Sequence, residues 1–143
     1  MDEPPVLHSR RSLTLRFDIP VSRTHEFWDA LREGRFVTTK CSKCGNVSFP
    51  PQADCPKCMN NGFVLVDVGR EATLLTFTQV KVTPASFAAS EPYIIAIGEF
   101  PGSLKVLAWL EGMDPKNAKL GMKLRVEART SKEGNPYYVF VPV

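Results

Sequence analysis

The chain contains Cys41-Ser42-Lys43-Cys44 and Cys55-Pro56-Lys57-Cys58, and these two stretches hold all four of its cysteines. They are two C-x-x-C pairs with ten residues between them. A two-residue spacer in a tight turn lets both sulfurs of a pair point at one ion, and two facing turns supply four thiolates in a tetrahedron. The pattern therefore predicts a metal-binding ribbon whose ligands are Cys41, Cys44, Cys55 and Cys58.

Other uses of the cysteines are disfavoured by their context. Two disulfides need an oxidising compartment, whereas the acidic, proline-rich start of the chain, residues 1–5, is unlike a signal peptide. A redox dithiol needs only one pair. We expect zinc, with iron as the less favoured alternative, because the thiolate knuckles resemble those of rubredoxin but are separated by a shorter segment. Four protein sulfurs leave no open coordination position, so the metal is expected to be structural.

A short helix is expected before the ribbon, over residues 24–33, with Thr24 as an acceptable N-cap and Gly34 at the stop position. Its large apolar side chains fall on one stripe: Phe27, Trp28 and Leu31. This stripe either packs on the protein's own core or docks onto another subunit, and the sequence leaves both open. Phe27 and Trp28 are therefore candidate partner contacts.

From residue 63 onward, the sequence predicts antiparallel strands separated by turn signals. The expected strands are 63–68, 72–82, 93–100, 104–111, 123–130 and 137–141. Two of them carry apolar residues on both faces, so the sheet must close on itself and also be covered outside. Five or six such strands fit a small barrel of the OB type.

The expected fold is thus mainly β, with an N-terminal helix, a rubredoxin-like zinc ribbon and a C-terminal OB-type antiparallel barrel. We divide the chain into an N-terminal arm and helix (1–35), the zinc ribbon (36–62) and the barrel (63–143).

Composition limits the function. Of 143 residues, 43% are apolar and 23% charged, which is ordinary for a globular protein, and no run is long enough to cross a bilayer. The net charge of +3 is spread evenly, whereas a dedicated nucleic-acid binder concentrates Lys and Arg on one face. With no export signal, we expect a soluble cytoplasmic protein.

The sequence is similar to a known family in its order of elements and in several short motifs. These motifs are the C-x-x-C-G and C-P-x-C knuckles, Phe49-Pro50-Pro51 between them, Pro92-Tyr93 before an apolar strand, and Leu120-Gly121-Met122 before a Val/Arg strand. Together they resemble the acyl-CoA-associated zinc-ribbon/OB-fold family, long catalogued as a domain of unknown function. The resemblance covers about residues 22–141.

The resemblance implies a non-catalytic partner of enzymes that handle acyl-CoA thioesters. The family's partners include thiolase-type enzymes, archaeal complexes of thiolase with hydroxymethylglutaryl-CoA synthase, acyltransferases and steroid side-chain hydratases. Such a protein helps to assemble the complex and can help to hold CoA or acyl-CoA. By resemblance only, the loop 83–92 and the adjoining barrel mouth are candidate surfaces for CoA or partner contact.

Candidate contact residues in and near this loop follow from their chemistry. Phe87, at the loop tip, can anchor a partner, stack on adenine or fold back onto the barrel. Tyr93 follows the loop. Lys81 and Lys105 can supply positive charge to CoA phosphates, although scattered lysines are more often plain surface.

The sequence does not favour an independent enzyme. No cysteine remains as a nucleophile once a metal takes four, and neither a nucleophile elbow nor a glycine-rich phosphate loop is present. The main alternative is a single-stranded nucleic-acid or tRNA-binding OB-fold protein, in which aromatic side chains would stack on bases. Its candidate stacking residues are Phe77, Trp109, Tyr137 and Tyr138.

Overall fold

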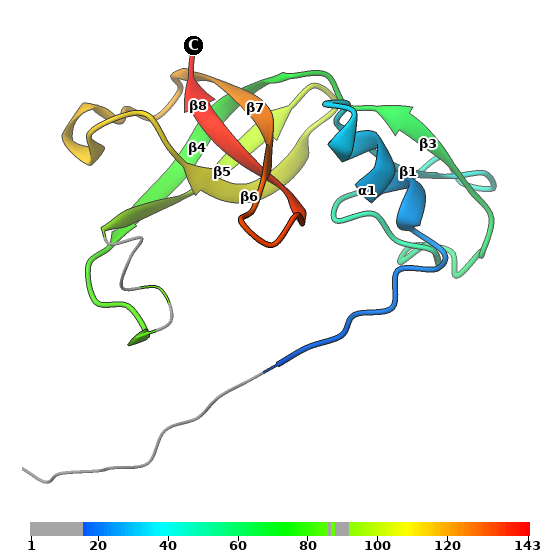
Figure 1. The fold of residues 1–143 in the computed structure, drawn as a ribbon. Helices are drawn as coiled ribbons and strands as arrows, with labels where there is room; N and C mark the ends of the chain where they lie inside the picture. The colour runs from blue at the N-terminus through cyan, green and yellow to red at the C-terminus, as the bar shows by residue number, and fades with distance from the viewer. Residues whose placement is uncertain (1–15, 86, 88–91) are drawn as a thin grey trace, which may run out of the picture.

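The computed structural model of the chain describes residues 16–85, 87 and 92–143. In this part of the chain, a short helix comes first, a three-stranded sheet follows, and a closed barrel completes the fold (Figure 1). The predicted fold class is therefore confirmed. No helix in the described ranges combines the length and apolar content that a membrane crossing requires.

The elements keep the order predicted from the sequence. The helix is α1 (His25–Arg32), and a 3-10 turn, η2 (Pro115–Asn117), lies between two late strands. The strands are β1 (Val37–Cys41), β2 (Val47–Ser48), β3 (Phe63–Asp67), β4 (Glu71–Val80), β5 (Tyr93–Phe100), β6 (Leu104–Leu110), β7 (Lys123–Thr130) and β8 (Pro136–Pro142).

Helix α1 packs its apolar stripe inside the molecule. Phe27 is 2% exposed, and its ring contacts Phe49 and Tyr138 at centroid distances of 6.0 and 6.5 Å. Leu31 is buried as well, while Trp28 is half-buried. Of the two roles left open for the stripe, packing on the protein's own core is the one observed, and Phe27 is not available at the surface as a partner contact.

The barrel closes in the order β4-β5-β6-β8-β7. Antiparallel hairpins join most neighbours, β6 and β8 pair in parallel, and β7 returns to β4. This order and the five strands found in the described residues fit the OB fold. Gly98 on β5 faces the interior, where a Cβ would lie 2.7 Å from the Phe140 ring. Only glycine, which has no Cβ, leaves room for the Phe140 ring of β8 to pack this closely against β5.

Strand β3 differs from the expectation. We expected residues 63–68 to belong to the barrel region, but β3 pairs along its length with β1 of the ribbon, with Thr39 opposite Leu65. A run of β-forming residues predicts a strand without specifying its partner. The domain boundaries as drawn from the sequence stay a prediction.

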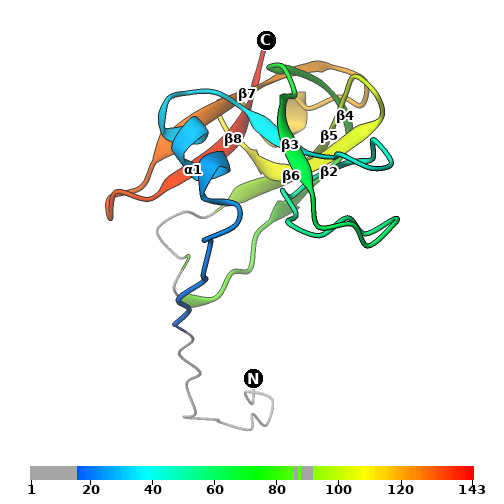
Figure 2. The same ribbon diagram turned by 90° about the vertical axis from the view of Figure 1, so that its right-hand side faces the viewer.

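Ribbon and barrel meet through aromatic side chains. Figure 2 views the molecule from the side on which α1 and β3 lie in front of the barrel. Phe36, just before β1, stacks on Phe100 of β5 at 5.7 Å and contacts Tyr138 of β8 at 5.3 Å. Phe49 of the ribbon contacts Tyr138 at 5.5 Å. The small ribbon thus shares the barrel's apolar core, and this fixes the position of the cysteine turns.

Candidate metal centre

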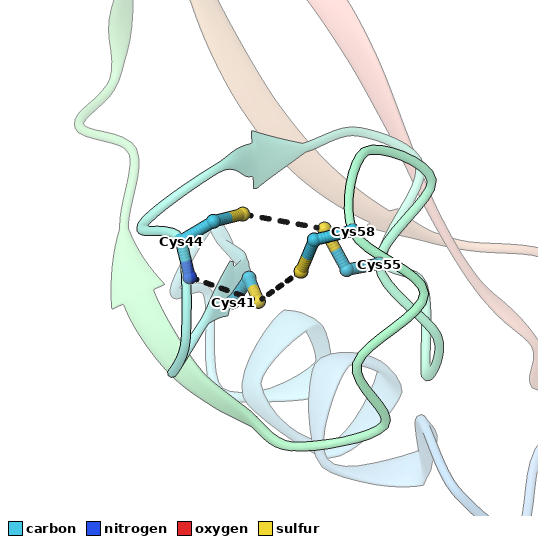
Figure 3. Close-up of side chains that lie close together, drawn as sticks. All are labelled: Cys41, Cys44, Cys55 and Cys58. Carbon is cyan, nitrogen blue, oxygen red and sulfur yellow. Dashed lines mark hydrogen bonds between the residues drawn. The ribbon is translucent and has the colours of Figure 1, made fainter.

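The first cysteine turn is built by backbone hydrogen bonds at the end of β1. The Cys41 N–H donates to the Asn46 carbonyl (2.9 Å), and the Gly45 N–H donates back to the Cys41 carbonyl (3.0 Å). Gly45 has φ of +72°, a left-handed conformation that glycine adopts without strain. This geometry turns the chain sharply and brings Cys44 to the same side as Cys41 (Figure 3).

The second turn has the same two backbone hydrogen bonds as the first. The Cys55 N–H donates to the Asn60 carbonyl (2.8 Å), and the Met59 N–H donates to the Cys55 carbonyl (2.9 Å). Met59 occupies the position of Gly45 and shares its left-handed backbone, with φ of +59°. The two turns are therefore one local structure used twice, with a methionine where the first has glycine.

The four sulfurs converge between these turns. All four Sγ atoms lie within 4.8 Å of one another, and the Cys41–Cys58 and Cys44–Cys55 pairs are each 3.6 Å apart (Figure 3). A tetrahedral zinc with Zn–S bonds of about 2.3 Å places its sulfurs about 3.8 Å apart. The donor set and its spacing therefore fit a tetrathiolate metal site. The predicted ligands are brought together as one group, with Cys41 and Cys55 buried and Cys44 exposed.

Amide groups make the sulfurs better ligands. The Lys43 and Cys44 N–H groups and the Asn60 side-chain amide reach Cys41 Sγ at 3.4, 3.5 and 3.7 Å. The hydrogen bond from the Cys44 N–H is the main cause that lowers the pKa of Cys41 to about 6. A lowered pKa favours the thiolate, which is the form that binds a metal.

In the second turn, burial and hydrogen bonds shift the pKa values of the cysteines in opposite directions. Burial raises the pKa of Cys55, but hydrogen bonds from the Cys58 and Lys57 N–H groups and with the Cys44 and Cys58 side chains together lower it by more, so the net shift is downward. The Asn60 N–H lowers the pKa of Cys58, yet burial and the neighbouring thiols raise it to about 11. A bound cation would deprotonate such a thiol, because it stabilises the thiolate directly.

Two of the other predicted contact residues, Phe87 and Tyr93, lie at the barrel, where they contact each other and Trp109 of β6. Phe87 is 41% exposed and contacts Tyr93 and Trp109 at centroid distances of 6.2 and 6.1 Å, while Tyr93 stacks on Trp109 at 4.7 Å. Of the alternatives considered for Phe87, folding back onto the barrel is observed. Tyr93 and Phe87 are brought together.

The two candidate lysines are not brought together. Lys81 follows β4 at the end where Val80 pairs with Tyr93. Lys105 lies opposite Glu99, at the other end of β5, and its Nζ is 3.8 Å from the Glu99 carboxylate. One small anionic group cannot contact both.

Trp28 belongs to the barrel surface rather than to the ribbon. It lines an apolar groove of about 590 Å³, together with side chains of β6 and β8. The side chains that flank Trp28 there include Leu107, Trp109, Tyr137 and Tyr138. The sequence placed Trp109 and Tyr137 only in the nucleic-acid alternative. Their clustering with Trp28 depends on the docking of α1, which no local pattern specifies.

The fold and the four-cysteine site define a class of protein: a rubredoxin-like zinc ribbon joined to an OB-fold barrel. Two family models match the chain, described as "ChsH2, rubredoxin-like zinc ribbon domain" over residues 28–60 and "ChsH2, C-terminal OB-fold domain" over residues 65–129. The chain belongs to this ChsH2 zinc-ribbon/OB-fold family, and the resemblance drawn from its sequence motifs is confirmed.

Relatives are found in archaea and bacteria. Proteins named "DUF35 domain-containing scaffold protein" are 29% identical in Methanocaldococcus jannaschii (68% of this chain, 70% of that one) and 28% identical in Pyrococcus furiosus (75% and 79%). The benzoylsuccinyl-CoA thiolase subunit BbsA of Thauera aromatica is 32% identical over 73 residues, which make up 51% of this chain and 49% of BbsA.

Solved structures support the fold. The chain in "Ltp2-ChsH2(DUF35) aldolase" superposes with a TM-score of 0.75 at 21% identity, over 89% of this chain and 98% of that one. A DUF35-family protein of unknown function from Sulfolobus solfataricus gives a TM-score of 0.53 at 23% identity, over 73% and 77%.

Proposed function

We propose that this protein is a non-catalytic accessory subunit that scaffolds an enzyme acting on acyl-CoA, with a thiolase-type enzyme as the first candidate partner. The observation that carries the proposal is the closed set of four sulfurs, because a metal held by four thiolates has no open position for substrate. The names of the relatives, scaffold protein and thiolase subunit, support an accessory role.

The metal is proposed to be zinc held by Cys41, Cys44, Cys55 and Cys58. Zinc is redox-inert and prefers the tetrahedral arrangement that the sulfur spacing fits, and structural zinc sites contribute folding energy directly. Iron remains the alternative for a four-thiolate site. Metal analysis of protein purified from its native host, without chelators, distinguishes the two.

Contact with CoA is proposed at the aromatic end of β5. The stacked Tyr93 and Trp109, with Phe87 beside them, offer flat surfaces to an adenine ring, and Lys81 lies at the same end of the strand for a phosphate. Lys105 lies at the far end and is left out of this contact.

Affinity purification from the native host tests the scaffold role. A tagged chain is expected to retain an acyl-CoA enzyme, identified by mass spectrometry. Partner retention that depends on the barrel surface should fall with W28A/W109A, whereas V143A, at a site that is 71% exposed and outside the groove lined by Trp28, serves as the surface control. Recovery of ribosomal or nucleic-acid components in place of such an enzyme would contradict the proposal.

Nucleic-acid binding is retained as a second candidate because the Tyr93–Trp109 stack lies on two adjacent barrel strands, as stacking residues do in OB-fold binders. Titration of CoA and of a short single-stranded oligonucleotide at two salt concentrations separates the candidates. Oligonucleotide binding that weakens steeply with salt, without CoA binding, would favour the second.

A further inference from the structure

Arg23 lies just before α1 and reaches across to the second cysteine turn. Its Nη1 donates to Asp54 Oδ1 at 3.1 Å, and its Nη2 donates to the carbonyl oxygens of Ala53 at 3.3 Å and Asn61 at 3.0 Å. Ala53 and Asp54 precede Cys55, and Asn61 follows Cys58. One guanidinium group therefore bridges the two ends of the segment that carries half of the metal ligands.

Such a bridge suits arginine in particular. The guanidinium is planar and carries several N–H donors in a fixed fork, so it can serve acceptors on both sides of a loop at once. A lysine in this place would offer one ammonium group on a flexible stem. We call Arg23 and its three acceptors, Ala53, Asp54 and Asn61, the Arg23 clasp.

The same residue is joined to helix α1. The Thr24 N–H donates to the Val21 carbonyl at 2.9 Å, and the Phe27 N–H donates to the Thr24 carbonyl at 3.1 Å, so the clasp adjoins the first turn of the helix. Phe27 in turn is buried against Phe36 and Phe49 of the ribbon. The helix thus contacts the ribbon at two points, the buried ring and the exposed clasp.

We propose that Arg23 is a positioning residue of the metal centre. It holds the second cysteine turn closed from outside the ligand shell, and it couples metal loading to the seating of the start of α1. Because such coupling is reciprocal, a bound metal must favour the seated helix by the same factor by which the seated helix favours the metal.

Arg23→Ala tests the first half of this proposal, and the chain offers a matched control. Arg35 has a similarly exposed ion pair, but its partner Glu33 is only two residues away and outside the ribbon. Metal transfer to an excess of a colorimetric chelator gives the dissociation rate. We expect R23A to release metal about threefold to tenfold faster than the unaltered protein. R35A is expected to leave the rate unchanged, and R23K to fall between. Equal rates for R23A and R35A would overturn the proposal.

A spectroscopic test separates Arg23 from residues that touch sulfur. Loading with Co²⁺ gives thiolate-to-metal absorption that reports on the ligands. R23A should leave this spectrum unchanged, because the guanidinium contacts the loop ends and not a sulfur. N60A should shift it, because the Asn60 amide donates to Cys41 Sγ. An altered tetrahedral spectrum in R23A would overturn action from outside the ligand shell.

Hydrogen exchange tests the coupling to α1. Chelation of the metal should speed exchange of the Thr24 and Phe27 amides and leave a barrel amide such as Val126, bonded to the Arg70 carbonyl at 2.8 Å, unchanged. In R23A, chelation should affect the two helix amides less. If metal removal does not change the exchange rates of these two amides in the unaltered protein, the coupling is disproved. None of these measurements involves a partner enzyme, so their outcome is independent of the proposed scaffold role.

Discussion

At the scale of single residues, the two cysteine turns use one backbone design with different side chains. Cys41-Ser42-Lys43-Cys44-Gly45-Asn46 and Cys55-Pro56-Lys57-Cys58-Met59-Asn60 share the same pair of backbone hydrogen bonds and the same left-handed fifth residue. Only the first has glycine at that position. The second turn therefore holds a strained methionine, whose side chain is 78% exposed and gains little from packing.

Replacing Met59 by glycine should stabilise the metal-loaded ribbon by about 0.5–1 kcal/mol. A left-handed L-residue costs about 1–2 kcal/mol, and the greater freedom of glycine in the unfolded chain offsets part of the gain. Slower metal release to a chelator is the expected readout. Met59→Ala keeps the strain and is the control. Faster release from M59G than from M59A would contradict this account.

The sequence identified the four ligands because two C-x-x-C pairs have few other uses. It did not identify Asn60 or Arg23. The asparagine repeats at the same offset in both turns, so the short C-x-x-C-x-N repeat was the available signal for Asn60. No sequence signal pointed to Arg23, because its acceptors lie 30 to 38 residues away and two of them are backbone carbonyls.

At the scale of elements, the ribbon is small, and we expect the proposed zinc to supply much of the free energy that keeps its cysteine turns folded. Cys44→Ser and Cys58→Ser should each abolish stoichiometric metal binding and open the ribbon. The barrel, whose interior is lined by its own strands, should keep its fold. Metal content by elemental analysis and limited proteolysis between residues 42 and 61 check this. Lys43→Ala keeps the backbone N–H that bonds Cys41 and serves as the control. Unchanged metal content in either serine variant would end the four-thiolate assignment.

The positions of the helix and strands were predicted well from the sequence, whereas which elements pair or pack together was predicted less well. Helix α1 and the strands from β3 onward lie close to where apolar patterns and turn residues placed them, because those signals are local. The pairing of β3 with β1 and the inward packing of Phe27 were not specified by the sequence. The pairing joins segments that are far apart in the chain, with Val37 opposite Asp67. The packing of Phe27 depends on an aromatic cluster assembled from widely separated residues.

At the scale of the whole molecule, that aromatic cluster joins ribbon to barrel. Phe36 is 5% exposed and contacts Phe100, Tyr138 and Phe49. Phe36→Ala should therefore lower the free energy of unfolding by about 3–5 kcal/mol, as expected for a buried Phe truncated to Ala. Denaturant unfolding measures it. Phe17→Ala, at a site 75% exposed, should have no comparable effect. A loss below 1 kcal/mol for F36A would show that ribbon and barrel are held together by other contacts.

The alkaline stability of the molecule should depend on Tyr138. Burial raises the pKa of this phenol, so the folded state favours the neutral form. As pH rises above the ordinary pKa of about 10, the unfolded chain ionises first, and stability is lost from there up to the folded pKa. Tyr138→Phe keeps the ring contacts and should lose less stability over that range. Identical alkaline profiles for the two proteins would contradict this.

The order of the barrel strands has a consequence for biosynthesis. Strand β8 follows all the others in the chain, yet it is the strand that joins β6 to β7, and it carries Tyr138 to the ribbon. On the ribosome, the cysteine turns emerge early and can capture their metal while the barrel is still an open sheet. A nascent chain stalled before residue 136 should therefore already hold the metal, but it should expose the Phe36 side of the ribbon to chaperones.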